Sequence, residues 1–216
     1  MADQTGRAPK DAQSGRERLP VRTLAIGLVW LVLVFGGSFM LLAYSNAPGP
    51  AGAAPARWPE SSRVTRASQR PTLVIFLHPH CPCSRVTTGE LALLMAHCQG
   101  RVEAQVFFLR PEVMPEDWVV TDLWRDAARI PGVVVHRDDD GREARLFGAE
   151  TSGDTRLYAA SGELLFHGGI TIARGHSGDN PGRDALEALL LGKPPGLTRT
   201  RVFGCSLFQC KLPKEK

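Results

Sequence analysis

Two cysteines separated by one residue are the side chains in this sequence best placed to do chemistry together. Cys81 and Cys83 stand in the string Phe76-Leu-His-Pro-His-Cys-Pro-Cys-Ser-Arg85. Two thiols this close can exchange electrons with another disulfide, or they can bind a soft metal ion such as Cu(I). A disulfide between them would close almost no loop and would stabilise the fold little. The pair therefore predicts redox or metal chemistry.

The residues around this pair predict a junction between a buried strand and a helix. Thr72–Leu77 is a short apolar run of the kind found in central strands, and a helix is expected from Ser84 to Cys98. Ser84 can cap the first turn of that helix through its hydroxyl group. Free N–H groups at a helix N-terminus stabilise an anion, so the thiol of Cys81 is expected to have a lowered pKa. The resulting thiolate is the nucleophile of disulfide exchange.

Two histidines add a metal-binding alternative. His78 and His80 flank the cysteine pair, and imidazoles combined with thiolates suit Cu(I) or Zn(II). A polar turn without a metal is the simpler interpretation and is the one favoured by the sequence. A copper site formed by His78, His80, Cys81 and Cys83 stays an alternative hypothesis, whereas the redox hypothesis requires no cofactor.

The remaining three of the five cysteines lie further along the chain. Cys98 falls on the apolar side of its predicted helix and is expected to be a small buried hydrophobic residue. Cys205 and Cys210 follow the last predicted helix. They are either a structural disulfide that pins the C-terminal tail or a second redox pair that passes electrons to Cys81 and Cys83. Both interpretations stay open.

An uncharged apolar stretch near the N-terminus predicts a membrane anchor. Residues 23–44 carry no charged side chain, and about 20 apolar residues suffice to cross a bilayer. The apolar part of a cleaved signal sequence is usually shorter, which favours an anchor. Basic residues are more frequent before the stretch than after it, so the N-terminus is expected in the cytoplasm. The rest of the chain then lies in the periplasm or another extracytoplasmic space, where thiols can be oxidised stably.

Composition and hydrophobic pattern divide the chain into five parts. Residues 1–22 form a cytoplasmic tail, 23–44 the transmembrane helix, 45–70 a flexible Pro/Ala/Gly linker, 71–195 an α/β domain, and 196–216 a cysteine-containing C-terminal tail. The predicted strands of the domain span residues 72–77, 103–109, 132–136, 155–159 and 163–167. The predicted helices span residues 84–98, 122–130, 138–147 and 181–191, with Asn180 as the cap of the last one and Pro181 at its first position.

These features together resemble the thioredoxin-like superfamily. The strand, the cysteine pair with proline before its second member, and the later β-β-α unit carry the resemblance, which covers about residues 71–195. It implies a three-layer α/β/α domain in which Cys81 is the attacking cysteine and Cys83 the resolving one, with one intervening residue deleted. Gly153-Asp154-Thr155 stands where the superfamily has a cis-proline, which predicts a different loop for substrate docking. Together with Gly168–Thr171 and Gly175–Asn180, the sequence looks like the RedB-like membrane proteins.

The resemblance implies a membrane-anchored, extracytoplasmic thiol–disulfide oxidoreductase. Its expected partners are a protein thiol or disulfide and the lipid bilayer. Nucleic acid is not an expected partner, because the basic residues are scattered and the net charge is only +4. Two alternatives are a Cu(I)-binding assembly factor or metallochaperone, and a thioredoxin-fold scaffold that binds a membrane partner without chemistry.

Overall fold

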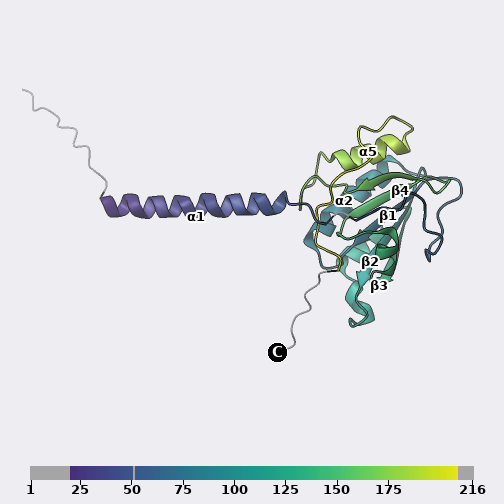
Figure 1. The fold of residues 1–216 in the computed structure, drawn as a ribbon, viewed down its shortest axis with the longest axis horizontal. Coiled ribbons are helices and arrows are strands. Elements are labelled where there is room, and N and C mark those ends of the chain that lie inside the picture. The colour runs from purple at the N-terminus through teal and green to yellow at the C-terminus, as the bar shows by residue number, and fades with distance from the viewer. Residues whose placement is uncertain (1–19, 51, 209–216) are drawn as a thin grey trace, which may run out of the picture. The chain divides into compact units, whose positions relative to one another are not determined.

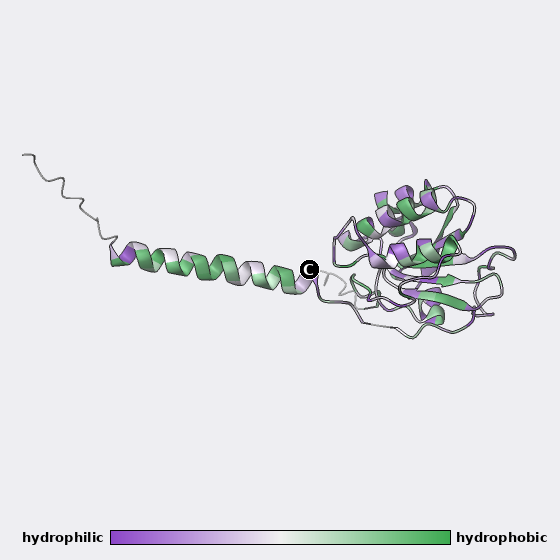
Figure 2. Cartoon of the chain, turned by 90° about the horizontal axis from the view of Figure 1, so that it is seen from above, coloured by the Kyte–Doolittle hydropathy of each residue, from purple (hydrophilic) through white to green (hydrophobic). Residues whose placement is uncertain are grey.

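The computed structural model describes residues 20–50 and 52–208. The chain divides into two compact units, residues 1–41 and 42–216. Helix α1, Val21–Ser45, makes up the described part of the first unit and reaches into the start of the second. Figure 2 shows apolar residues along its length. Within the described residues, α1 is the one helix long and apolar enough to cross a membrane.

The second unit contains a mixed sheet of five strands (Figure 1). The strands are β1 (Thr72–Leu77), β2 (Glu103–Arg110), β3 (Val133–Asp139), β4 (Asp154–Tyr158) and β5 (Leu164–Gly168). Their order across the sheet is β3-β2-β1-β4-β5, with β1 at the centre. Strands β1, β2 and β3 run parallel, whereas β4 is antiparallel to both β1 and β5.

The helices of this unit lie on both faces of the sheet. They are α2 (Pro82–His97), α3 (Asp122–Ala128), α4 (Arg142–Phe147), α5 (Pro181–Leu190) and a 3-10 helix, η1 (Glu116–Val119). Alternate residues of β1 point to opposite faces. Leu73, Ile75 and Leu77 pack with side chains of α2, α3 and α5, whereas Val74 and Phe76 pack with side chains of α4. The predicted α/β order of strands and helices is confirmed.

Two helix starts, those of α2 and α4, differ from the prediction, and so does the cap of α5. Helix α4 begins at Arg142 and not at residue 138, because Asp138 and Asp139 belong to β3. Helix α2 begins at Pro82 with Cys81 at the cap position, two residues earlier than expected. Ser84 is therefore not the cap: its hydroxyl donates to the carbonyl oxygen of His78 at 3.1 Å. Asn180 stands at the cap position of α5, but its side-chain oxygen accepts the N–H of Ile172 at 2.8 Å instead of one from the helix.

The stretch predicted as a flexible linker packs against the domain where the structure describes it. The Trp58 ring lies edge-on to Phe147 and Tyr158, with ring centroids 5.1 and 5.4 Å apart. The hydroxyl of Ser62 donates to Glu143 at 2.8 Å, and the hydroxyl of Tyr158 donates to the carbonyl of Pro55 at 3.1 Å. The Pro, Ala and Gly content correctly indicated irregular backbone, but it does not determine whether such backbone packs on a neighbour.

Candidate active site

The chain turns sharply from β1 into α2, and Cys81 stands at the end of this turn. The N–H of Cys81 donates to the carbonyl of His78 at 3.1 Å, and the N–H of Ser84 donates to the carbonyl of Cys81 at 3.0 Å. Pro82 occupies the first helical position, where its missing N–H costs nothing. The predicted placement of Cys81 at a helix N-terminus is confirmed.

A second cysteine, 124 residues further along the chain, is in contact with Cys81. The sulfur atoms of Cys81 and Cys205 lie 2.9 Å apart, within hydrogen-bonding distance. The sequence had suggested Cys210 as the neighbour of Cys205, because the two are close along the chain. Cys210 lies outside the described residues.

Main-chain hydrogen bonds hold Cys205 in this position. We call residues 202–208 the C-terminal segment; it runs beside the loop that precedes β4. The N–H of Ser152 donates to the carbonyl of Cys205, and the N–H of Leu207 donates to the carbonyl of Glu150, both at 2.8 Å. Thr151 and Ser206 form an antiparallel bridge between the loop and the C-terminal segment. The segment is thus paired with this loop like a short added strand.

The surroundings of Cys81 favour its anionic form. The hydrogen bond from the thiol of Cys205 is the largest influence, and it lowers the pKa of Cys81 to about 4. Burial acts in the opposite direction, while backbone N–H groups of Cys205, Ser84 and Cys83 lower the pKa further. The same sulfur–sulfur hydrogen bond, with burial and the charge of Cys81, raises the pKa of Cys205 far above its usual range. The contact between the two sulfurs therefore favours the anionic form of Cys81 and the protonated form of Cys205.

Cys83 completes a cluster of three sulfur atoms. Burial, followed by the negative charge of Cys81 and a hydrogen bond with it, raises the pKa of the Cys83 thiol. Cys81 itself is only 4% exposed, whereas Cys83 and Cys205 are half-buried. Cys98 is fully buried in the hydrophobic core, as the sequence predicted.

Arg174 is a positively charged neighbour of this cluster that the sequence did not single out. Its charge lowers the pKa of both Cys83 and Cys205, against the larger effects that raise them. Its guanidinium group also donates to the carbonyl oxygen of Gly204 and, at 3.2 Å, to that of Ala47. Arg174 therefore both fixes the backbone next to Cys205 and provides charge that can stabilise a second thiolate.

The two predicted histidines use their ring nitrogens in other contacts. The Nδ1 atom of His78 accepts the N–H of His80 at 3.2 Å, and Nε2 of His80 lies 3.0 Å from the carbonyl oxygen of Trp118. Burial lowers the pKa of His78, so its ring is neutral. In the part of the chain that the structure describes, no group of three or more His, Cys, Asp or Glu side chains is arranged to hold a metal ion. The copper hypothesis therefore gains no support from this geometry.

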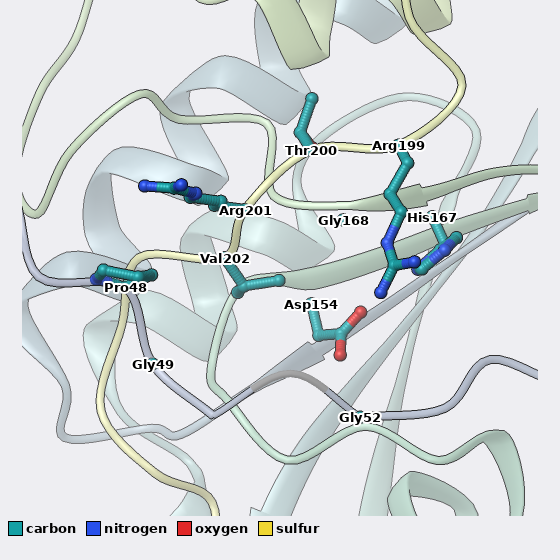
Figure 3. A pocket seen from close by; sticks show the side chains of 10 residues that line it. All are labelled: Pro48, Gly49, Gly52, Asp154, His167, Gly168, Arg199, Thr200, Arg201 and Val202. Carbon is teal, nitrogen blue, oxygen red and sulfur yellow. The ribbon is translucent and has the colours of Figure 1, made fainter.

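A cavity of about 340 Å³ lies beside the C-terminal segment (Figure 3). It is lined by Pro48, Gly49, Gly52, Asp154, His167, Gly168 and residues 199–202. No cysteine lines it, so the cavity is separate from the sulfur cluster. Figure 3 shows the carboxylate of Asp154 and the guanidinium group of Arg199 facing each other across it.

Comparison with known proteins bears on the fold. No protein-family model matches the chain, and no curated protein matches it. Solved structures do. A hypothetical protein from Sinorhizobium meliloti is 24% identical, with 65% of this chain and 80% of that chain covered and a TM-score of 0.54. An uncharacterized conserved protein from Geobacillus kaustophilus is 19% identical, with 76% and 90% covered and a TM-score of 0.52.

A third solved structure is a secreted disulfide oxidoreductase from Mycobacterium tuberculosis homologous to DsbE of E. coli. It is 14% identical, with 58% of this chain and 84% of that chain covered and a TM-score of 0.43. The strand order and strand directions of the sheet, with helices on both faces, are those of a thioredoxin-like fold. In this thioredoxin-like domain the loop before β4 reaches the turn that carries Cys81: the hydroxyl of Ser152 accepts the N–H of His78 at 2.8 Å and lies 2.7 Å from the hydroxyl of Ser84.

Proposed function

We propose that the protein is a membrane-anchored, extracytoplasmic thiol–disulfide oxidoreductase in which Cys81 is the nucleophile. One observation carries this proposal: Cys81 stands at the N-terminus of α2 with its sulfur 2.9 Å from that of Cys205, and this environment lowers the pKa of Cys81. Thiolates, not thiols, attack disulfides, and the lowered pKa keeps Cys81 in the thiolate form near neutral pH.

The reaction is an exchange of sulfur–sulfur bonds. The thiolate of Cys81 attacks one sulfur of a substrate disulfide, a mixed disulfide forms, and the other substrate sulfur leaves as a thiolate. A second thiol of the chain, deprotonated, then attacks Cys81 and releases the remaining substrate sulfur. Two electrons pass from the protein to the substrate, and the reverse sequence oxidises a substrate dithiol. The resemblance to thioredoxin-like proteins assigns the second thiol to Cys83.

The proposed location follows from α1 and the charges on either side of it. Its apolar length suits a bilayer anchor, and the excess of basic residues before residue 23 supports an N-terminus in the cytoplasm. The domain then faces an oxidising compartment, where a disulfide substrate is available. The resemblance of the sequence to the RedB-like membrane proteins is a further reason for proposing this arrangement.

Replacing Cys81 by serine tests the proposal. Cys81→Ser is expected to reduce the rate of insulin-disulfide reduction, or of scrambled-substrate reactivation, to the uncatalysed background, because a serine hydroxyl does not exchange with disulfides. The full chain in detergent micelles is the material for the assay. Cys98→Ala, which changes a buried cysteine at the C-terminal end of α2, is the matched control and keeps the wild-type rate. Equal rates for wild type and Cys81→Ser would refute the proposal.

A further inference from the structure

We propose that Cys205, and not Cys83, is the thiol that resolves the mixed disulfide on Cys81, so that the oxidised protein carries a Cys81–Cys205 disulfide. This inference rests on the proposed function, because it identifies the second thiol of the same exchange. It changes the role of the C-terminal segment from a pinned tail to a part of the active site.

The first support is the distance between the reacting atoms. The sulfurs of Cys81 and Cys205 lie 2.9 Å apart, and a disulfide bond needs about 2.05 Å. An approach of roughly 1 Å therefore suffices for the bond to form. The two residues come from separate segments of the chain, so the approach needs no change in the backbone of α2.

The second support is the way in which the C-terminal segment is held. Its main chain pairs with residues 150–152 through two hydrogen bonds and a bridge, and the side chain of Leu207 is 1% exposed. Gly204 makes the close approach feasible, because a Cβ atom there would lie 1.9 Å from the carbonyl oxygen of Ser152. Peptide strands bind to proteins by this kind of pairing, with side chains directed into the site. The segment thus presents Cys205 to Cys81 in the way that a bound peptide would present its own cysteine.

The third support is that Cys83 is the less suitable partner. Pro82 separates it from Cys81 and fixes the backbone at the start of α2. A disulfide between residues i and i+2 at this point would close a small, strained ring. Cys205 has no such restraint, because it approaches the sulfur of Cys81 from the opposite strand-like segment.

Charge explains when Cys205 becomes reactive. In the resting protein the contact between the two sulfurs, 2.9 Å apart, favours negative charge on Cys81 and so raises the pKa of Cys205. Once Cys81 has formed a mixed disulfide, that sulfur carries no charge, whereas the guanidinium group of Arg174 still faces Cys205. Cys205 then loses its proton to the departing substrate thiolate or to water. Its thiolate attacks the sulfur of Cys81, the new bond forms, and the second substrate sulfur leaves as a thiolate and is protonated.

Because Cys81 is 4% exposed in contact with Cys205, the C-terminal segment must move aside for the first attack. The segment then returns, so that Cys205 can attack the mixed disulfide on Cys81. In net terms one substrate disulfide becomes two thiols, and the thiols of Cys81 and Cys205 become one disulfide. The substrate disulfide is the oxidant, and no other reagent is required.

Mapping of the disulfides after reaction with glutathione disulfide tests this inference. The fully reduced full-length chain in detergent micelles is mixed with glutathione disulfide, quenched with acid, digested and analysed by mass spectrometry. Wild type is expected to yield the Cys81–Cys205 peptide pair and free glutathione. Cys205→Ser and Cys205→Ala are expected to stop at glutathione on Cys81, with a mixed-disulfide lifetime longer by on the order of 100-fold or more. Cys83→Ser is expected still to yield the Cys81–Cys205 pair, and Cys210→Ser is the control that is expected to behave as wild type.

Two results would overturn the inference while leaving the proposed function intact. One is a long-lived mixed disulfide in Cys83→Ser together with a Cys81–Cys83 disulfide in Cys205→Ser. The other is a Cys205–Cys210 disulfide in the oxidised wild type with glutathione retained on Cys81. A different result, no glutathione on Cys81 in any variant and no disulfide at Cys81, would overturn the proposed function and the inference with it. Circular dichroism of each variant shows that it is folded before the reaction.

Discussion

Replacing Cys205 by alanine is expected to raise the pKa of Cys81 by several units, from about 4 toward the ordinary thiol value of 9.0. The hydrogen bond from Cys205 is the largest influence on that pKa, and alanine removes it while burial still opposes the charge. The N–H groups at the start of α2 remain, so the final pKa stays below that of a free thiol. The ultraviolet absorbance of thiolates, recorded against pH on the reduced full chain, measures the change.

Cys205→Ser is the matched control for this prediction. Its hydroxyl can still donate a hydrogen bond to the sulfur of Cys81, although it cannot form a disulfide. The pKa of Cys81 in Cys205→Ser is therefore expected to stay closer to the wild-type value than to that of Cys205→Ala. The two substitutions thus separate the electrostatic role of Cys205 from its proposed chemical role. An unchanged pKa in Cys205→Ala would mean that the helix N-terminus alone stabilises the thiolate.

Removing the carboxyl group of Asp154 is expected to lower the free energy of unfolding by about 3–5 kcal/mol. Asp154 forms an ion pair with Arg156 at 3.2 Å, and their side chains are 4% and 0% exposed. The Nε and Nη1 atoms of Arg156 have no hydrogen-bond partner within the described structure. In Asp154→Ala the buried guanidinium group would keep one neutral partner, the carbonyl of Gly148. Chemical denaturation of the full chain in detergent measures the loss.

A double substitution provides the control for this pair. Asp154→Leu combined with Arg156→Met removes both charges and fills the space with apolar atoms, so its stability is expected to lie close to that of wild type. A loss of the same size in Asp154→Ala and in the double variant would show that packing, and not the unpaired charge, is responsible.

The pH dependence of the same comparison has a defined sign. Burial raises the pKa of Asp154 to about 6, above its reference value of 3.8. A raised pKa means that the folded state binds the proton more tightly than the unfolded state, so protonation between these values favours folding. The stability difference between wild type and Asp154→Ala is therefore expected to widen as the pH falls from about 6 to about 4.

The sequence predicted the order of strands and helices because those elements have strong local signals. The apolar run of β1 and the turn at Ser161-Gly162 between β4 and β5 both identify their neighbours without tertiary information. The start of α2 was predicted two residues too late, because Cys81 at the cap position makes no side-chain hydrogen bond to the helix that would mark the start. Boundaries of this kind depend on backbone hydrogen bonds that a sequence does not display.

The active-site turn was also predictable, whereas its most important neighbour was not. Cys81 follows a buried strand directly, so its place at a helix N-terminus could be inferred from nearby residues. Cys205 lies 124 residues away, and its contact with Cys81 depends on how residues 202–208 pair with the loop before β4. Arg174 likewise reaches the site from a loop without regular structure. Contacts between distant irregular segments leave no periodic pattern in the sequence.

The most direct test of the account is the order in which the cysteines react with iodoacetamide at about pH 5.5, where an ordinary thiol is almost fully protonated. The reduced full chain is treated briefly, digested and analysed by mass spectrometry. Cys81 is expected to be alkylated ahead of Cys83, Cys98 and Cys205, because Cys81 alone of these has a lowered pKa. An unmodified Cys81 alongside slow alkylation of the other three would contradict it.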